Sequence, residues 1–331
     1  MTPTASSAPA ASTLPDASAA TASAATASAA PATVPPRSAE PSIGYISLDG
    51  SQAFVQAVSL GIRESATAAG IDLVECDSGW SRKGVRACAE QLAQAGVHGV
   101  ISFQPFADLA AEVCTTTGDA PTIGIVYDQG PCQVSMLQID QAESGRMAGA
   151  AMGQLAALRW GCDVKAYISL ESDDGDSIGA ERMQGYRDGY QEHCELPEET
   201  RTLIGAQHLV TAKTQVAAAL EKLKGRPILV AGVSDIAILG AMEAAADAGR
   251  EDHLWYSGQL ADSDIRAEIA CNDRYIASVA QLPERFGTAL VPTLVDAIEG
   301  RDVVPRIDAE LQLVTAENVR QLFPDTPACD E

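Results

Sequence analysis

Short apolar runs rich in β-branched residues alternate with longer segments of helical periodicity along most of this chain. Nine runs have the length and composition of buried strands: 43–48, 71–75, 97–102, 121–126, 164–170, 201–206, 227–230, 253–256 and 275–280. Helical patterns lie between them, such as 54–69, 85–95, 141–158, 178–193, 214–223 and 236–248. Continuous apolar strands that alternate with helices indicate parallel sheets covered on both faces. The pattern therefore predicts an α/β fold.

Glycines mark the predicted ends of several helices, where left-handed caps are expected: Gly70, Gly96, Gly225 and Gly249. The strands suit either one wide sheet or two smaller ones, and periodicity does not decide between them. In either arrangement, ligands bind beyond the carboxyl ends of the strands. Function is therefore expected at those ends.

The first 40 residues have a different composition, since 34 of them are Ala, Ser, Thr or Pro. Only Asp16, Arg37 and Glu40 are charged there. Such a segment has too little bulky apolar surface to offset the entropy of ordering it. Residues 1–41 are therefore predicted to be a disordered tether, and the 331 − 40 = 291 residues after residue 40 are enough for two medium domains.

The charge balance restricts the partners of the chain. It has 22 Lys and Arg against 45 Asp and Glu, a formal net charge of −23. Such a charge disfavours nucleic acids and anionic membrane surfaces, which are bound by neutralising phosphates. No run approaches the roughly 18 to 20 apolar residues that span a bilayer.

The eight cysteines show no metal-ligand spacing, because the chain has no C-x-x-C and its four histidines stand far apart. An even number of cysteines without such spacing favours disulfides and an oxidising compartment over scattered buried thiols. Of the possible pairings we expect Cys162 with Cys194 and Cys114 with Cys132. No metal and no cofactor is expected.

Three segments resemble catalytic or metal-binding motifs but lack a required part. The segment 49–52 follows the first strand without a Gly-rich or Walker pattern, which disfavours a nucleotide site. The segment 232–236 begins like a nucleophile elbow, yet Ile236 replaces the closing Gly. The acidic residues at 171–176 lack the spacing of a calcium loop and fit a solvated loop. No catalytic pair stands out, so an enzyme is the least favoured class.

A set of polar and aromatic residues follows successive strands. Planar amides and carboxylates can engage adjacent hydroxyls while an aromatic face packs on C–H groups, so the set suits a neutral polyol. The alternative is that such residues cap helices, and Ser234 and Asp235 fit both interpretations equally well. The expected ligand-binding residues are Ser51, Phe54, Gln104, Asp128, Gln129, Ser234, Asp235, Gln259 and Gln281.

From residue 42 to about 318, the chain resembles the type I periplasmic substrate-binding proteins, specifically the ribose-type sugar-binding components of ABC importers. The most specific segment is 277–287, ASVAQLPERFG, close to the family's sequence around a crossover strand. Weaker matches are Phe54-Val55, the turn at 140–145, Gly185-Tyr186 with Arg182 upstream, and 234–240.

The resemblance implies two doubly wound parallel-sheet lobes joined by a three-stranded hinge, with the ligand between them. The N-terminal lobe would comprise 42–139 plus 282–305, and the C-terminal lobe 140–281 plus 306–331. Phe54, Asp128 and Gln281 match family residues that stack on the sugar ring or bond its hydroxyls. Three further positions are usually Asn in the family and are here Ser51, Gln104 and Ser234.

Other positions depart from the family. Two hydroxyl-binding arginines are replaced by Ala180 and Gln129. Stacking aromatics are replaced by Ala53, Leu209 and Gln259, and an adjacent Asp by Leu260. These losses argue against ribose itself and favour another sugar, a polyol or a different small polar molecule. The remaining carboxylates, Asp128 and Asp235 among them, leave a cationic or nucleoside-like ligand as the alternative.

The resemblance thus implies an extracytoplasmic solute-binding protein, monomeric and not an enzyme, that presents a sugar or polyol to an ABC permease. The tether would lead to a lipid anchor on a Cys before residue 1. A transcription regulator with this ligand domain should carry a basic helix-turn-helix before the first strand, which residues 1–41 do not offer. A ligand-sensing partner of a membrane receptor kinase remains open, because sequence does not separate sensing from import.

Overall fold

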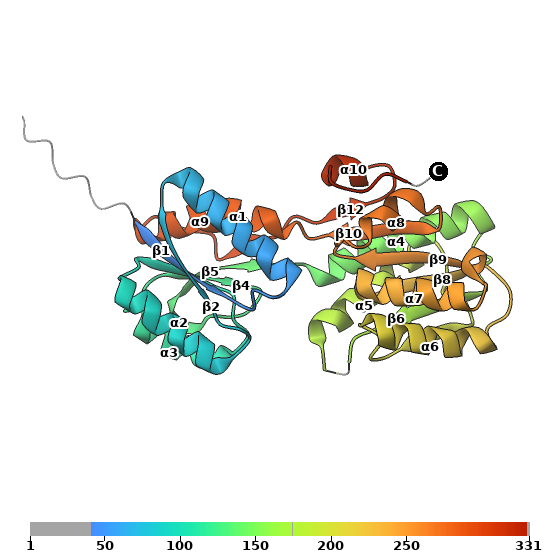
Figure 1. The fold of residues 1–331 in the computed structure, drawn as a ribbon, viewed down its shortest axis with the longest axis horizontal. Coiled ribbons are helices and arrows are strands. Elements are labelled where there is room, and N and C mark those ends of the chain that lie inside the picture. The colour runs from blue at the N-terminus through green and yellow to red at the C-terminus, as the bar shows by residue number, and fades with distance from the viewer. Residues whose placement is uncertain (1–40, 174, 330–331) are drawn as a thin grey trace, which may run out of the picture. The chain divides into compact units, whose positions relative to one another are not determined.

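The computed structural model describes residues 41–173 and 175–329. In these residues the strands form two sheets of six, in the orders β11-β5-β4-β3-β1-β2 and β12-β10-β9-β8-β6-β7 (Figure 1). The predicted tether lies outside the described residues, except for Pro41 at its end. Asp174, within the acidic segment 171–176, also lies outside them.

The first sheet consists of parallel strands throughout its described pairs. Its strands are β1 (Ser42–Ser47), β2 (Asp72–Asp77), β3 (Gly99–Ser102), β4 (Thr122–Ile125), β5 (Gln133–Gln138) and β11 (Arg306–Asp308). One face packs against α1 (Ala53–Ala69) and α9 (Phe286–Ile298). The other packs against α2 (Arg82–Ala95) and α3 (Ala110–Thr116). Single 3₁₀ turns are η1 (Ala107–Leu109), η2 (Gly130–Cys132) and η4 (Pro283–Arg285).

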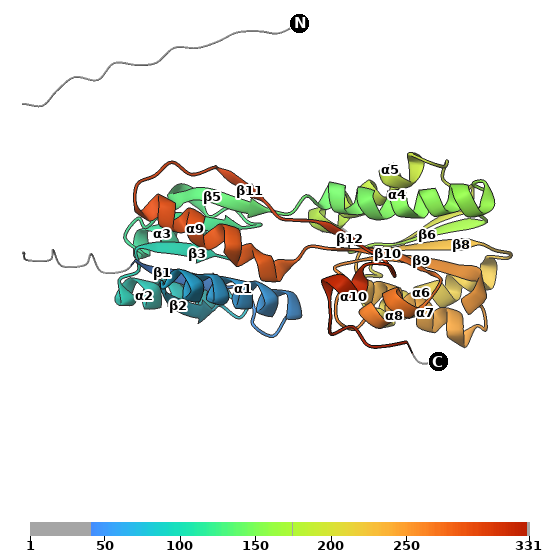
Figure 2. The same ribbon diagram turned by 90° about the horizontal axis from the view of Figure 1, so that it is seen from above.

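The second sheet repeats this layering (Figure 2). Its strands are β6 (Ala166–Leu170), β7 (Thr200–Leu203), β8 (Ile228–Gly232), β9 (Leu254–Gln259), β10 (Tyr275–Ala280) and β12 (Gln312–Val314). The long helices α4 (Gln141–Trp160) and α5 (Ser177–Gln191) cover one face. The other face carries α6 (Leu209–Lys222), α7 (Asp235–Asp247), α8 (Arg266–Cys271) and α10 (Val319–Leu322), with η3 (Glu251–His253) before β9.

The chain passes between the two sheets three times, after β5, after β10 and after β11. The predicted α/β fold with two doubly wound lobes and a three-stranded hinge is thereby confirmed. At the first crossing, the side chain of Asp140 accepts a hydrogen bond from the Glu143 amide at 2.8 Å and so caps the start of α4. This cap fixes the residue at which α4 begins after the crossing.

The third crossing lies beyond the predicted boundary at residue 305. Residues 306–331 were assigned to the C-terminal lobe, but Arg306–Asp308 pair with β5 in the first sheet. The crossing therefore follows Asp308, and β12 then pairs antiparallel with β10. A three-residue strand with two exposed side chains has no periodicity that a sequence could reveal.

Two of the predicted glycine caps end helices directly. Gly70 after α1 and Gly96 after α2 take left-handed φ angles of 68° and 67°, which glycine adopts without steric cost. Gly225 and Gly249 also have positive φ, 83° and 59°. They lie one or two residues beyond the caps that end α6 and α7.

Helices α4 and α5 pack unusually closely because glycines face each other across their contact. A Cβ on Gly149 would overlap the carbonyl oxygen of Tyr186, and one on Gly189 would overlap that of Arg146. Gly145 and Gly185 are equally confined by backbone atoms of the opposite helix. The bare backbone at these positions lets the two helices cover one face of the second sheet as a single layer.

All eight cysteines are paired, including both expected pairs. The disulfides are Cys76–Cys88, Cys114–Cys132, Cys162–Cys194 and Cys271–Cys329, with Cα–Cα distances of 5.4 to 5.6 Å. Each links a helix or its end to a neighbouring segment of the same sheet's layer. Within residues 41–173 and 175–329, no helix is long and apolar enough to cross a membrane.

Candidate functional site

Two of the expected ligand-binding amides bond to each other beyond the first sheet. Gln129 is almost fully buried, and its Oε1 accepts from Ser102 Oγ at 2.7 Å and from Gln104 Nε2 at 2.8 Å. Its Nε2 donates to the carbonyl oxygens of Gln104 and Tyr127 at 3.0 and 2.9 Å. Gln104 Oε1 in turn accepts from the Phe106 amide at 2.7 Å. The Gln129 side chain therefore has no spare hydrogen-bonding capacity for a ligand.

Ser51 and Asp128 are exposed residues of loops that follow β1 and β4. Ser51 Oγ donates to Asp49 Oδ1 at 2.7 Å, and Asp128 Oδ1 accepts from the Gly130 amide at 2.6 Å. Both bonds are local and stabilise the turns that contain them. Their remaining capacity is open to solvent.

Asp235 begins α7 but lies inside the second sheet's layer, 1% exposed. Its Oδ1 accepts from Tyr275 Oη at 2.7 Å, and Oδ2 accepts from the Asp262 amide at 3.2 Å. Ser278 Oγ lies 3.0 Å from both oxygens. Burial raises the pKa of this carboxyl to about 7, even though the bond from Tyr275 lowers it. The group is held by protein donors on every side.

Ser234 and Gln259 are also engaged within the second sheet's layer. Gln259 is fully buried, and its amide exchanges two bonds with Ser144, accepting from Oγ and donating to the carbonyl oxygen at 3.1 Å. Ser234 precedes α7 without capping it, and its Oγ donates to the Gln207 carbonyl at 3.3 Å. Hydrogen bonds of this kind join segments that are distant in sequence and hold the helices against the sheet.

A buried network joins two of the three crossings. Gln141, the first residue of α4, accepts at Oε1 from Arg182 Nε at 3.0 Å and from Gln281 Nε2 at 3.4 Å. Arg182 Nη1 also donates to the Val233 carbonyl at 2.6 Å. Burial lowers the pKa of the Arg182 guanidinium. Gln281 is thereby oriented by Gln141 at the point where the chain leaves β10.

A cavity of about 220 Å³ lies beyond the carboxyl ends of β9 and β10. Phe54 of α1 and Gln281 line it, and the Phe54 ring meets the Phe286 ring edge-on with centroids 6.0 Å apart. The other lining residues include the segment 260–264, the turn 282–284, Arg266 and Phe323. Of the nine predicted site residues, the cavity brings together these two, Phe54 and Gln281.

Asp262 and Asp264 also line this cavity and are not among the nine predicted site residues. They stand three and five residues after the end of β9, within the strand-end region where function was expected. The predicted residue of this region, Gln259, lies at the strand end itself, whereas the cavity is lined by the residues that follow it. Counting every polar residue of that loop would have found them.

A larger cavity, about 610 Å³, lies at the opposite ends of the same strands. Trp255 near the start of β9 and Arg274 before β10 line it, together with the Cys271–Cys329 disulfide. The Arg159 and Arg274 guanidiniums lie 5.5 and 4.6 Å from the Trp255 ring centroid. In parallel sheets ligands bind at carboxyl ends, so this cavity is not the candidate site.

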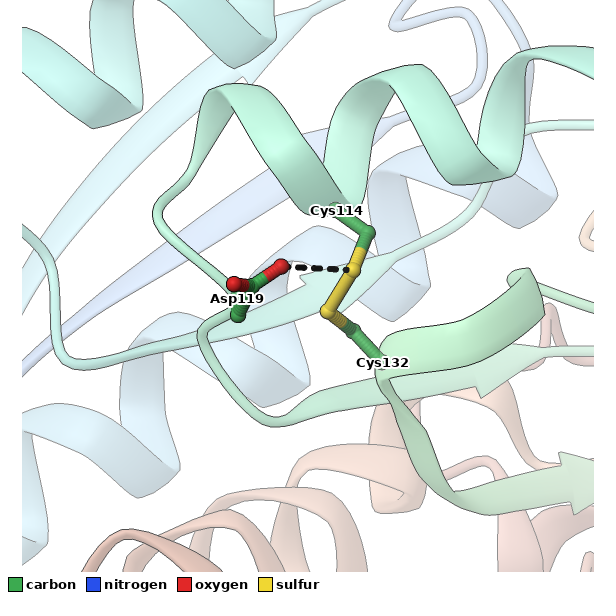
Figure 3. A group of neighbouring side chains, drawn as sticks. All are labelled: Cys114, Asp119 and Cys132. Atoms are coloured by element: carbon green, nitrogen blue, oxygen red, sulfur yellow. Dashed lines mark hydrogen bonds between the residues drawn. A yellow bond between two sulfur atoms is a disulfide. The ribbon is translucent and has the colours of Figure 1, made fainter.

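Cys114, Asp119 and Cys132 are the kind of residues that bind metals, and their ligand atoms lie within 4.8 Å of one another (Figure 3). The two cysteines form a disulfide, and Asp119 Oδ1 lies 3.5 Å from Cys114 Sγ. Metals bind thiolates, which this disulfide does not provide. The group therefore offers a metal only one carboxylate.

Comparison with known proteins adds a family and a fold. A family model described as a periplasmic binding protein domain matches residues 43–302. No curated protein sequence matches the chain. A solute-binding protein of an ABC transporter from Actinobacillus succinogenes 130z with bound D-allose is similar in structure, with a TM-score of 0.70. It is 14% identical over 85% of this chain and 100% of its own.

Two further solved structures are similar to the same extent. An ABC transporter solute-binding protein from Mycobacterium smegmatis with bound glycerol is 19% identical over 88% of this chain and 100% of its own, with a TM-score of 0.70. One from Bacillus halodurans C-125 with bound myo-inositol is 18% identical over 86% and 97%, with a TM-score of 0.66. At these identities the likeness shows a shared fold.

Proposed function

The chain belongs to the periplasmic binding protein domain family, and from this premise we propose that it is an extracytoplasmic solute-binding protein that captures a small sugar or polyol. The observation that carries the proposal is the cavity lined by Phe54, Gln281 and the carboxylates of Asp262 and Asp264. An aromatic ring packs on sugar C–H groups, and amides and carboxylates engage hydroxyls. Its volume suits a small ligand rather than a drug-sized one.

The proposed mechanism is closure around the three crossings. The cavity is lined by Phe54 from a helix of the first sheet and by the segment 260–264 from the second. A ligand that contacts both lobes only when they are closed shifts the population toward the closed state. Capture then needs no chemical step, and the lobes are 42–139 plus 282–308 and 140–281 with the chain after residue 308.

The partners follow from the same proposal. The closed protein would present its ligand to an ABC permease as a monomer, and the tether would link it to a lipid anchor. The four disulfides support an oxidising, extracytoplasmic compartment.

A thermal-shift screen tests the proposal. The protein is partly unfolded and refolded to remove carried-over ligand, then mixed with sugars, polyols, amino acids, polyamines and nucleosides. A ligand at about a hundred times its Kd stabilises the folded state by roughly 2.7 kcal/mol. Stabilisation confined to sugars or polyols is the expected result. Stabilisation only by polyamines or nucleosides, or by nothing, would overturn the proposal.

A further inference from the structure

Three residues other than glycine hold left-handed backbone angles around the candidate cavity. Leu260 and Ala261, directly after β9, have φ angles of 95° and 51°, and Leu282, after β10, has 47°. All three line the cavity. Such angles are unfavourable for residues with a side chain and persist only where surrounding contacts impose them, and they cluster at functional sites. The segment after β9 therefore has an unfavourable backbone conformation that its surroundings must impose.

Hydrogen bonds from β10 and α7 impose this shape. The Leu260 amide donates to the Val279 carbonyl at 2.8 Å, and the Ala261 amide to Ser278 Oγ at 3.0 Å. The third successive amide, that of Asp262, donates to Asp235 Oδ2 at 3.2 Å. Asp235 thus fixes the backbone from which the Asp262 side chain leaves.

Asp235 and Asp262 differ in whether their carboxylate oxygens are free to accept hydrogen bonds from a ligand. Asp235 is 1% exposed, and its oxygens are occupied by Tyr275, Ser278 and the Asp262 amide. Asp262 is partly buried, lines the cavity, and within the described residues its carboxylate oxygens accept no hydrogen bond and form no ion pair.

The charged groups near Asp262 do not neutralise it. Arg266 uses its guanidinium elsewhere: Nε donates to the Ala261 carbonyl at 2.9 Å, and the group stacks 3.7 Å from the Phe323 ring centroid. Arg182 bonds to Gln141 and Val233. Burial raises the pKa of Asp262 further than the attraction to Arg266 lowers it. A partly desolvated carboxylate without donors gains most from a ligand that brings them.

We propose that the Asp262 carboxylate accepts hydrogen bonds from hydroxyl groups of the bound sugar or polyol. Asp235 is then a positioning residue, because it holds the backbone amide of Asp262. This deepens the proposed function and rests on it. Phe54 and Gln281 line the same cavity, so a ring held on Phe54 can present adjacent hydroxyls to an amide and a carboxylate together. The side chain of Leu260 has no hydrogen-bonding group, so the carboxylate in this part of the cavity is that of Asp262, two residues later.

Calorimetric titration of the ligand-stripped protein with D-allose, glycerol and myo-inositol tests the assignment, with putrescine as a cationic probe. Asp262→Asn should weaken binding of the sugar or polyol by about 10- to 100-fold, the loss expected for hydrogen bonds to a charged acceptor. Its thermal midpoint should not fall, because the carboxylate makes no bonds in the unliganded protein. Asp163→Asn, an exposed position of the same charge before β6, is the matched control and should leave affinity unchanged.

A double-mutant cycle tests the positioning role of Asp235. Asp235→Asn should weaken binding in the wild-type background and add little to the loss in Asp262→Asn, since both changes act on one contact. Additive losses would overturn that role.

The outcomes also separate the two proposals. Unchanged affinity of Asp262→Asn for a probe that the wild type binds would overturn the assignment and leave the proposed function standing. Binding of putrescine alone, or of none of the probes, would overturn the proposed function and the hydroxyl assignment with it.

Discussion

Glutamine side chains perform two different tasks in this protein. Three side-chain amides form hydrogen bonds with buried protein groups, those of Gln104, Gln129 and Gln259. Gln281 instead lines the cavity and forms one long hydrogen bond, to Gln141. An amide offers two donors and an acceptor with two lone pairs, so it can satisfy several buried groups at once. Residue type alone therefore does not separate a ligand contact from an internal brace.

Truncation of Gln129 should lower stability. Gln129→Ala leaves Ser102 Oγ and Gln104 Nε2 buried without their partner, and each such loss costs about 1 to 3 kcal/mol. Urea unfolding monitored by circular dichroism measures the change. Gln154→Ala, at an exposed position on α4, should be neutral. Equal stability of both variants would show that the buried network contributes nothing.

The raised pKa of Asp235 predicts a pH dependence of stability. The folded state keeps this proton up to about pH 7, whereas the unfolded chain releases it near the ordinary value of 3.8. The resulting stabilisation is fully present below the unfolded pKa and is lost as pH rises through the folded one, by an amount on the order of a few kcal/mol. The stability of the wild type relative to Asp235→Asn should therefore fall between pH 4.5 and 7.5.

Unfolding of both proteins by urea across this pH range measures the difference. Asp163→Asn should follow the wild type throughout. A wild-type advantage over Asp235→Asn that grows with pH would mean that Asp235 is held ionised by its donors and that burial is the smaller effect.

At the scale of elements, the close contact between α4 and α5 depends on glycines, because they have no Cβ. Their backbones approach so closely that a single methyl group has no space, because the opposing atoms are carbonyl oxygens rather than side-chain ends. Such a contact resists repacking, since neither helix can move without leaving the sheet that both cover. It is the element pair on which one whole face of the second sheet depends.

Gly149→Ala should therefore destabilise the protein in spite of a better helix propensity. Alanine gains about 1 kcal/mol of propensity over glycine in a helix interior, but overpacking typically costs about 1 to 3 kcal/mol and more where backbone must shift. The thermal midpoint is expected to fall, with Gln154→Ala on the same helix unaffected. A rise in the midpoint would show that the two helices separate freely.

The sequence predicted elements with a strong apolar signature and missed weak ones. All nine apolar runs correspond to strands, from β1 to β10 without β5. The strand β5, QVSMLQ, is half-exposed, and β11 and β12 have three residues each. Segments of that length and polarity are strands only because a neighbour offers a sheet edge, which is a tertiary effect.

Two of the nine predicted site residues line the candidate cavity, and the others lie elsewhere for a related reason. Phe54 and Gln281 line the cavity, but Gln259 bonds to Ser144, which lies 115 residues earlier in the chain. Sequence position places a side chain at a strand end and does not say which distant group it meets. Asp235 shows this most clearly, since helix capping and ligand binding were the two interpretations, and the structure buries it against Tyr275, Ser278 and the Asp262 amide.

At the scale of the whole molecule, the proposed closure would act through the three crossings between the sheets. Gln141 and Gln281 lie at two of them and bond to each other, so a ligand contact at Gln281, as proposed, would be coupled to the first residue of α4. Closure of this kind rotates two packed bodies and leaves each sheet unchanged. The scattering of the protein in solution should report it.

Saturation with a sugar or polyol found in the thermal screen should reduce the radius of gyration measured by small-angle X-ray scattering. The reason is that ligand contacts from both lobes favour the closed state. Asp262→Asn at the same ligand concentration should remain nearer the unliganded value. A ligand that binds with full occupancy and no change in scattering would contradict hinge closure.

Neither half of the molecule is continuous along the chain. Helix α9 supplies Phe286, Leu290, Val291 and Leu294 to the core of the first sheet, although that sheet's first five strands end at residue 138. A polypeptide that emerges N-terminus first from a ribosome or an export channel therefore cannot complete its N-terminal lobe until residue 308 is out. Nascent chains stopped at residue 281 should bind a hydrophobic dye that chains stopped at residue 329 do not. The interleaved order is thus expected to leave the N-terminal lobe without a complete core, and therefore easier to thread through a narrow pore, until synthesis of the chain is nearly finished.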